Sequence, residues 1–256
     1  MIHQTAIIDP GAQLGKGVEI GAYTVIGPQV TIGAHTKVGS HVIIKGPTEI
    51  GERCTVFPFA SLGDIPQDLK FKGEATKLII GNNNMIREYV TMNRGTEKGG
   101  GKTTIGNSNF FMAYSHIAHD CTINNFVIMA NAATLAGHIT IEDYAVIGGL
   151  VAIHQFVKVG RNAFIGGCSA IPQDVPPYCL AVGNRARLYG LNLTGLKRHN
   201  FSPQTIRNLK DAYRMIFRSG LTLKDALEQL EQESTDSPEV NHFVEFIKTS
   251  KRGVIR

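Results

Sequence analysis

The sequence predicts a mainly β fold, a parallel β-solenoid followed by a small α-helical domain. Three observations predict it. An apolar residue recurs at every sixth position through most of the chain, glycine often follows that residue, and helical spacing of apolar residues replaces the repeat near the C-terminus. In a chain of 256 residues, we place the solenoid at residues 1–184 and the helical domain at residues 185–256.

The six-residue repeat runs from Leu14 to Leu62, resumes in phase from Ile80 to Met92, and resumes one residue out of phase from Ile105 to Ile171. All 24 positions of this series carry apolar residues. A helix has a period of 3.6 and an alternating strand a period of two, whereas a short strand and a tight turn together take about six residues. Glycine supplies turn backbone that a side chain would hinder. Such coils bury their apolar faces on one another.

The pattern of an apolar residue, glycine and, four places on, a small residue resembles the hexapeptide-repeat acyltransferases. That family builds a left-handed parallel β-helix with three hexads in each coil. The resemblance therefore implies coils of 18 residues, with the last coil near Val182. Chain stretches 63–79 and 94–104 leave the repeat, and we expect them to be loops that project from the rod and carry function.

Three helices are expected after Gly183, where the hexads end. Ser202-Pro203 reads as the N-cap and first residue of one helix, Thr222 caps a second, and Ser237-Pro238 begins a third. Apolar residues at helical spacing follow each start, so each helix has one face to bury.

Composition and charge limit the classes of partner. Lys and Arg equal Asp and Glu through Asn184, so the net charge of +5 belongs to the chain from Arg185 onward. A basic C-terminal part suits an acidic protein or a phosphate-bearing ligand, or is an ordinary solvated helical surface. The sequence lacks the dense basic run with interleaved aromatic residues that would predict nucleic-acid binding. It also lacks an apolar run of membrane-spanning length. The start lacks the pattern of a signal peptide, so we expect a cytoplasmic protein.

A polar cluster is expected around His119, within the stretch SHIAHDCTI. Residues 18 apart stack on adjacent coils, about 4.8 Å from each other. On the next two coils the position of His119 is taken by Gly137 and Gln155, and Asp120 stacks on His138. The residues gathered near this corner of the rod are His116, His119, Asp120, Gly137, His138, His154 and Gln155.

This cluster has the composition of a general-base site. A histidine titrates near neutrality, and a neighbouring carboxylate fixes its tautomer and stabilises the imidazolium. The carboxylate that orients His119 stays open, since Asp68 on the first loop and Asp120 are both candidates. The backbone N–H of Gly137, unobstructed by a side chain, is placed to face a developing oxyanion.

Several stretches together resemble one family among these enzymes, the acyltransferases that transfer an acyl chain from acyl carrier protein to UDP-N-acetylglucosamine at the start of lipid A synthesis. The stretches that carry this resemblance, which covers essentially the whole chain, are IPQDLKFKGE, RGT, HIAHDCTI, TLAGH, GGLVAIHQF, IGGCSA, QDVPPY and GLKRHNFS.

The resemblance implies direct transfer of an (R)-3-hydroxyacyl chain to the 3-hydroxyl of the sugar, without a cofactor, a metal or a covalent intermediate. His119 is then the general base, Asp68 orients or supports it, and Gly137 supplies the oxyanion N–H. Acyl carrier protein is the donor, and the enzyme is a homotrimer with sites between subunits. The implied substrate-binding residues are Gln67, Lys70, His116, His138, His154 and Gln155, with Asn192 and Arg198 at the UDP end.

The chain departs from the family pattern at three positions: Thr194 and His199 replace nucleotide-contacting Glu and Arg, and Asn93 replaces a histidine. Gly167 stands where the family sets acyl-chain length, and glycine there suggests an open groove and a longer chain. The sequence decides neither the chain length nor whether the acceptor carries a hydroxyl or an amine.

Other functions remain as alternatives. The three alternatives are a hexapeptide-repeat enzyme that uses a coenzyme A thioester, a γ-carbonic-anhydrase-like zinc enzyme, and a binding scaffold without catalytic activity. The HxxH pair His116 and His119 resembles a set of zinc ligands, although the γ-class enzymes space their histidines differently.

Overall fold

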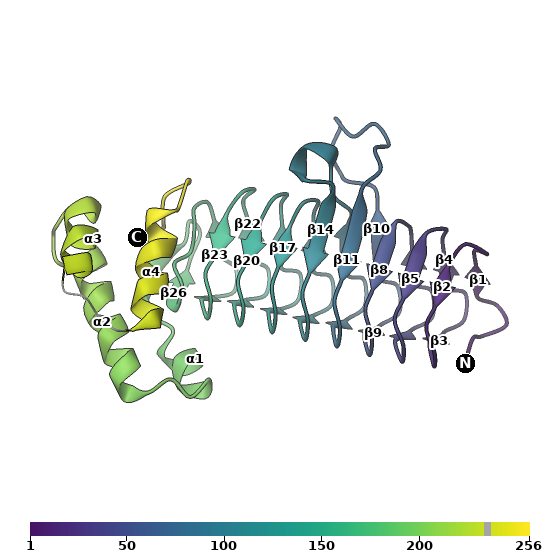
Figure 1. Cartoon of the computed structure of the whole chain (residues 1–256), viewed down its shortest axis with the longest axis horizontal. Helices are drawn as coiled ribbons and strands as arrows, with labels where there is room; N and C mark the ends of the chain where they lie inside the picture. The colour runs from purple at the N-terminus through teal and green to yellow at the C-terminus, as the bar shows by residue number, and fades with distance from the viewer. Residues whose placement is uncertain (233–236) are drawn as a thin grey trace.

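The fold of the chain is a straight rod of stacked coils with a group of helices at one end, as seen in a computed structural model (Figure 1). The structure describes residues 1–232 and 237–256. The N-terminus lies at the end of the rod opposite the helices. Three sheets run along the rod, and in the described part of the chain they hold 9, 8 and 10 strands.

Each coil contributes one short strand to each sheet. The first sheet comprises β1 (Ile7–Ile8), β4 (Val25–Ile26), β7 (Ile43–Ile44), β10 (Ser61–Asp64), β13 (Thr91–Asn93), β16 (His116–Ile117), β19 (Thr134–Leu135), β22 (Ala152–Ile153) and β25 (Ala170–Ile171). The second comprises β2 (Gln13–Leu14), β5 (Val30–Ile32), β8 (Thr48–Ile50), β11 (Lys77–Ile80), β14 (Lys102–Ile105), β17 (Thr122–Ile123), β20 (Thr140–Ile141) and β23 (Lys158–Val159). The third comprises β3 (Glu19–Ile20), β6 (Lys37–Val38), β9 (Thr55–Val56), β12 (Met85–Ile86), β15 (Phe110–Phe111), β18 (Ile128–Met129), β21 (Val146–Ile147), β24 (Phe164–Ile165), β26 (Cys179–Val182) and β27 (Arg187–Leu191).

The predicted coil of 18 residues is confirmed by the strand register. His116 pairs with Thr134, and Thr134 pairs with Ala152, in parallel along the first sheet. Every apolar position of the six-residue series is buried except the half-buried Leu14. The fold class expected from the sequence, a mainly β parallel solenoid with a C-terminal helical region, is therefore confirmed.

Two loops leave the rod on the same side, near its middle (Figure 1). They are shorter than the sequence suggested, at residues 65–76 and 94–101, because β10, β11 and β14 extend into the expected loop regions. The second loop contains a short 3₁₀-helix, η1 (Glu97–Gly99), capped by Thr96. The first loop leaves from β10 and returns at β11, and the second leaves from β13 and returns at β14.

The C-terminal helices begin where their caps predicted. They are α2 (Pro203–Arg218), α3 (Leu223–Gln232) and α4 (Pro238–Lys248). Sequence reasoning missed α1 (Leu193–Arg198), which is too short to show apolar periodicity. It also missed β27, which pairs antiparallel with β26 and lies beyond the end of the hexads. The division of the chain at residues 184 and 185 stays a prediction. Within the described residues, the helices are all too short or too polar to cross a bilayer.

The adjacent isoleucines of β7 offer a matched test of the interior. Ile44 is fully buried, whereas the side chain of Ile43 faces outward and is 42% exposed. We expect Ile44→Ala to lower the free energy of unfolding by about 2–5 kcal/mol, because it removes buried methyl groups and leaves a cavity. The control Ile43→Ala should lower it by less than about 1 kcal/mol. Urea denaturation measures both, and equal losses would contradict the assignment of the two faces.

Candidate active site

The centre of the candidate site is a hydrogen bond between His119 and the residue that follows it. Nδ1 of His119 lies 2.7 Å from Oδ2 of Asp120. The Asp120 side chain is fully buried, and the His119 side chain is 15% exposed. Asp120 sits at a coil corner with φ +61, a left-handed conformation that Asp adopts more readily than most residues. An ionised carboxylate accepts only, so Nδ1 of His119 carries the proton and Nε2 is left free.

Asp120 has further donors in addition to His119. The backbone N–H of Thr96 donates to Oδ1 at 2.7 Å, and the Thr96 hydroxyl donates to Oδ2 at 2.6 Å. Nε2 of His138 lies 3.6 Å from Oδ2. The backbone N–H of Asp120 itself donates to Oγ1 of Thr103. A buried carboxylate needs such donors to remain ionised, so this set explains how a charge is held inside the rod.

Gly137 lies directly beside the His119 ring, as the coil register predicted. A Cβ atom on Gly137 would lie 2.5 Å from Cε1 and 2.8 Å from Nε2 of His119. A side chain there would displace the ring, so glycine is required for this packing. The backbone N–H of Gly137 makes no hydrogen bond within the described part of the chain. A free donor therefore lies close to the free nitrogen of His119.

His116 and His138 flank this pair. Nδ1 of His116 is 2.7 Å from Oγ1 of Thr91. Burial lowers the pKa of His116, and the nearby charge of His119 lowers that pKa further. The His138 ring meets the His119 ring edge-on and stacks on Phe156. Both histidines thus occupy defined positions beside the candidate base.

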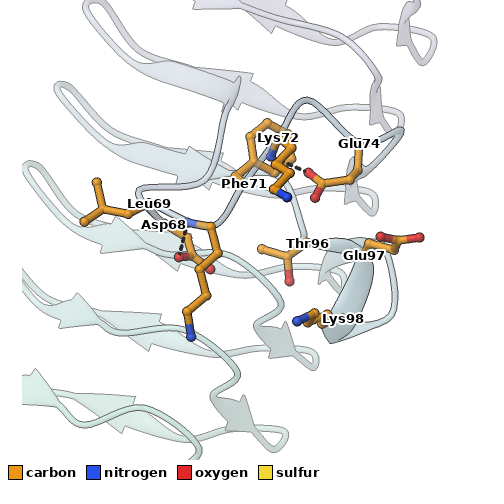
Figure 2. A pocket seen from close by; sticks show the side chains of 9 residues that line it. Asp68, Leu69, Phe71, Lys72, Glu74, Thr96, Glu97 and Lys98 are labelled. Carbon is orange, nitrogen blue, oxygen red and sulfur yellow. Dashed lines mark hydrogen bonds between the residues drawn. The ribbon is translucent and has the colours of Figure 1, made fainter.

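Asp68 forms no hydrogen bond or ion pair with His119 within the described residues of one chain. It lies on the first loop, where its Oδ1 accepts a hydrogen bond from the backbone N–H of Lys70 at 2.9 Å. The structure thus places Asp120, of the two candidates, beside the histidine. Asp68 and Lys70 instead line a cavity of about 510 Å³ between the two loops, with Thr96 and Lys98 on the second loop (Figure 2). The role of Asp68 stays a prediction.

The remaining predicted sugar contacts are exposed. Gln67 is exposed on the first loop, and His154 and Gln155 are exposed at the corner that follows β22. Nδ1 of His154 approaches the carbonyl oxygen of Gln155 at 3.2 Å. Within the described residues, neither His154 nor Gln155 forms a hydrogen bond with His119. Their place in the site therefore depends on what covers this face.

The predicted nucleotide contacts come together in a separate cavity of about 420 Å³. Asn192 caps α1, since its Oδ1 accepts from the Gly195 N–H, and its Nδ2 donates to the Asn162 carbonyl. Six aromatic and aliphatic residues also line this cavity. The lining comprises Phe126, Ile128, Tyr144, Val146, Phe164, Leu180, Asn192, Thr194, Gly195, Arg198 and His199.

Gly167, the predicted acyl-length position, is exposed on the rod. A Cβ atom added there would meet the carbonyl oxygen of Gly149 at 3.2 Å and otherwise little else within 4 Å. A larger side chain would therefore extend outward from the surface. This is the geometry that an adjustable end wall of a groove would need.

A metal is disfavoured by the donor set. His119, Asp120 and His138 each offer one ligand atom, and these atoms lie within 4.8 Å of one another in the described part of the chain. The Asp120 oxygens, however, already accept hydrogen bonds from Thr96 and His119. At Oδ2, which accepts two of these hydrogen bonds, a cation would have to replace one of the donors. This group of possible ligands contains His119 and His138, so it differs from the HxxH pair of His116 and His119.

Thr96 is the residue of the site that sequence reasoning missed. It follows the conspicuous Arg94-Gly95 pair but carries no ionisable group, and its contact with Asp120 spans 24 residues. The available signal was its place as a helix cap ahead of the glycine run, and that signal points to local structure.

A parallel solenoid of six-residue repeats with a helical C-terminal region is the fold of the hexapeptide-repeat acyltransferases. Family models agree with this class. One described as "Udp N-acetylglucosamine O-acyltransferase; Domain 2" matches residues 174–255, and one described as "Bacterial transferase hexapeptide (six repeats)" matches residues 1–34.

Full-length relatives define the family. The acyl-[acyl-carrier-protein]–UDP-N-acetylglucosamine O-acyltransferase of Thermodesulfovibrio yellowstonii is 57% identical over 255 residues, covering 100% of this chain and 99% of that protein. The solved LpxA from Acinetobacter baumannii is 47% identical, with a TM-score of 0.97 over 100% of this chain and 99% of that one. The Arabidopsis UDP-N-acetylglucosamine acyltransferase is 38% identical, with a TM-score of 0.89 and complete coverage of both chains. The chain belongs to the UDP-N-acetylglucosamine O-acyltransferase family, which confirms the family expected from the sequence.

The lowered pKa of His116 leads to a prediction. In the folded protein His116 should titrate below about 6.5, the ordinary histidine value. The unfolded chain then takes up its proton first, so His116 destabilises the fold as pH falls below about 6.5 and has no such effect above it. NMR of histidine-labelled protein, with His116→Gln to assign the signal, measures the midpoint. In His119→Ala the midpoint should rise, and a wild-type midpoint at or above 6.5 would contradict the burial argument.

Proposed function

We propose that the chain transfers an (R)-3-hydroxyacyl group from acyl carrier protein to the 3-hydroxyl of UDP-N-acetylglucosamine, the first step of lipid A biosynthesis. The relative from Thermodesulfovibrio yellowstonii carries acyl carrier protein and UDP-N-acetylglucosamine in its name. The observation that supports a mechanism is the 2.7 Å hydrogen bond between His119 and the buried Asp120, with Gly137 beside the free Nε2.

The reaction needs one base and one oxyanion donor. Nε2 of His119 takes the proton of the sugar 3-hydroxyl as the oxygen attacks the thioester carbonyl. The carbonyl oxygen becomes an oxyanion, which the N–H of Gly137 stabilises. The carbon–sulfur bond then breaks, and the thiol leaves with the proton that the imidazolium returns. Asp120 holds Nδ1–H and stabilises the imidazolium between these steps.

The other site residues are assigned by their place. His116 and His138 flank the base and contact the sugar, and Gln67, Asp68 and Lys70 reach it from the first loop. His154 and Gln155 complete the surface on the next coil. Asn192 and Arg198 hold the UDP end in the cavity beside α1, where Thr194 and His199 give this chain a nucleotide pocket of its own composition.

We infer a homotrimer whose active sites lie between subunits. Leu69, on the first loop, is completely exposed, and its neighbours Gln67 and Lys70 are also exposed. Ile65, on the same loop, is also exposed, and apolar side chains exposed together favour contact with a partner. A second copy of the chain would cover this face and enclose the His119 cluster. The proposed location of the enzyme is the cytoplasm.

The base is tested by His119→Ala. We expect kcat to fall about 10²-fold to 10⁴-fold, the usual contribution of a general base. His35→Ala, an exposed histidine on an N-terminal coil, is the matched control and should retain wild-type turnover. The assay uses 3-hydroxyacyl chains on acyl carrier protein and on coenzyme A, and activity with the coenzyme A thioester alone would overturn the donor. A folded His119→Ala protein with near wild-type turnover would overturn the mechanism.

The acyl-length role is tested by Gly167→Met. We expect the preferred chain to become shorter, because the added side chain occupies the end of the groove that glycine leaves open. A panel of acyl carrier protein thioesters of increasing length measures the preference as a ratio of kcat/KM values. Unchanged selectivity in an active variant would reject the assignment.

A further inference from the structure

We propose that Thr96 is a positioning residue for the transfer reaction, which fixes the Asp120 carboxylate so that His119 is held in its catalytic orientation. The inference rests on the proposed role of His119 as the base. It assigns a chemical purpose to the second loop, residues 94–101, beyond that of a connection between strands.

Thr96 holds the Asp120 carboxylate by two hydrogen bonds, one to each oxygen, and this pair of bonds is called the grip. The Thr96 N–H donates to Oδ1 of Asp120 at 2.7 Å and its hydroxyl donates to Oδ2 at 2.6 Å. Rotation of the carboxylate about its Cβ–Cγ bond would break both bonds at once. Oδ2 also accepts from Nδ1 of His119, so the grip sets the direction in which this oxygen faces the imidazole.

The direction of the Thr96 hydroxyl is itself determined. Its oxygen accepts a hydrogen bond from the backbone N–H of Gly99 at 3.2 Å, which leaves its proton for Asp120. The Thr96 carbonyl accepts from the N–H of Gly101 at 2.8 Å. The turn of η1 is therefore closed around Thr96, and the loop cannot shift without moving the donors of the carboxylate.

Gly99 shows that the loop is shaped to the carboxylate. A Cβ atom at this position would overlap the carboxyl carbon and both oxygens of Asp120. The backbone of Gly99 does not require the left-handed region, whereas Gly100 does, with φ +97. Glycine is thus needed at position 99 for its contact with Asp120 and not for its backbone conformation. Two residues of one loop are matched to one buried charge.

The burial of Asp120 strengthens the hydrogen bonds that Thr96 donates to it. The Asp120 side chain is fully buried, so no water competes for its oxygens. A hydrogen bond to an ionised group in such a place is stronger than a neutral one. Loss of the hydroxyl leaves an oxygen of the carboxylate short of a donor and free to turn toward His138, whose Nε2 is 3.6 Å away. His119 would then lose its fixed tautomer.

The test compares substitutions that keep or remove the hydroxyl. Thr96→Val keeps the shape and removes the donor, Thr96→Ser keeps the donor, and Thr31→Val, at an exposed position of β5, is the control. We expect Thr96→Val to lower kcat about 10-fold to 100-fold, as for the loss of a hydrogen bond to a charged group. Thr96→Ser should stay within about 3-fold of wild type, and KM for the sugar nucleotide should change less than about 2-fold in both.

A double-mutant cycle separates positioning from a structural role. Asp120→Asn alone should lower kcat, and Thr96→Val added to it should lower kcat by less than a further factor of about 3, because Thr96 acts through Asp120. Multiplied effects, wild-type turnover in Thr96→Val, or an equal loss in Thr96→Ser would each overturn the proposal. If Thr96→Val does not fold, Thr96→Ala, which also removes the hydroxyl that donates to Asp120, replaces it in the same cycle with the same expected outcomes. A failure of the proposed function would appear elsewhere, as an inactive wild type or an active His119→Ala.

Discussion

The structure depends on the burial of one apolar side chain from each hexad in a narrow interior shared by three sheets. Because each coil pairs with the next through parallel strands, a slip of one residue would turn every buried side chain outward. The register is therefore strongly specified along the whole rod. This constraint also fixes the outer corners, where His119 is brought onto Gly137 from the next coil and the imidazole occupies the space that the glycine leaves.

A rigid rod of this kind is convex, so a histidine at its corner has to be oriented without a surrounding pocket. The chain does this by burying the carboxylate that accepts from the histidine. The Asp120 side chain is fully buried whereas that of His119 is 15% exposed, so the charge beside the imidazole is shielded from solvent. The loop of residues 94–101 completes the arrangement by covering Asp120 with its own donors. The two loops leave the rod at neighbouring coils, which places the loop that covers Asp120 and the loop that carries Asp68 on the same side.

The limits of sequence reasoning follow from the range of the interactions involved. The repeat predicted the coil length and the neighbours of His119, since these depend on spacing alone. It did not predict α1 or β27, which are too short or too irregular for a period to appear. Nor did it decide between Asp68 and Asp120, because the first loop is free to approach or avoid the histidine. The contact of Thr96 with Asp120 could not be predicted either, because a threonine in a glycine-rich loop resembles an ordinary helix cap.

Four features could be predicted from the amino-acid sequence alone: the solenoid, the stacking of His119 with Gly137, the three long helices and the family. Each of these features is indicated by periodic spacing, by local capping residues or by motifs spread along the chain. The tertiary structure decided that Asp120 is the buried partner of His119, that Thr96 grips it, and that Asn192 and Arg198 line one cavity. These contacts join residues from loops and helices whose paths no period describes. The direction of a hydrogen bond, and the burial that strengthens it, exist only once the chain has folded.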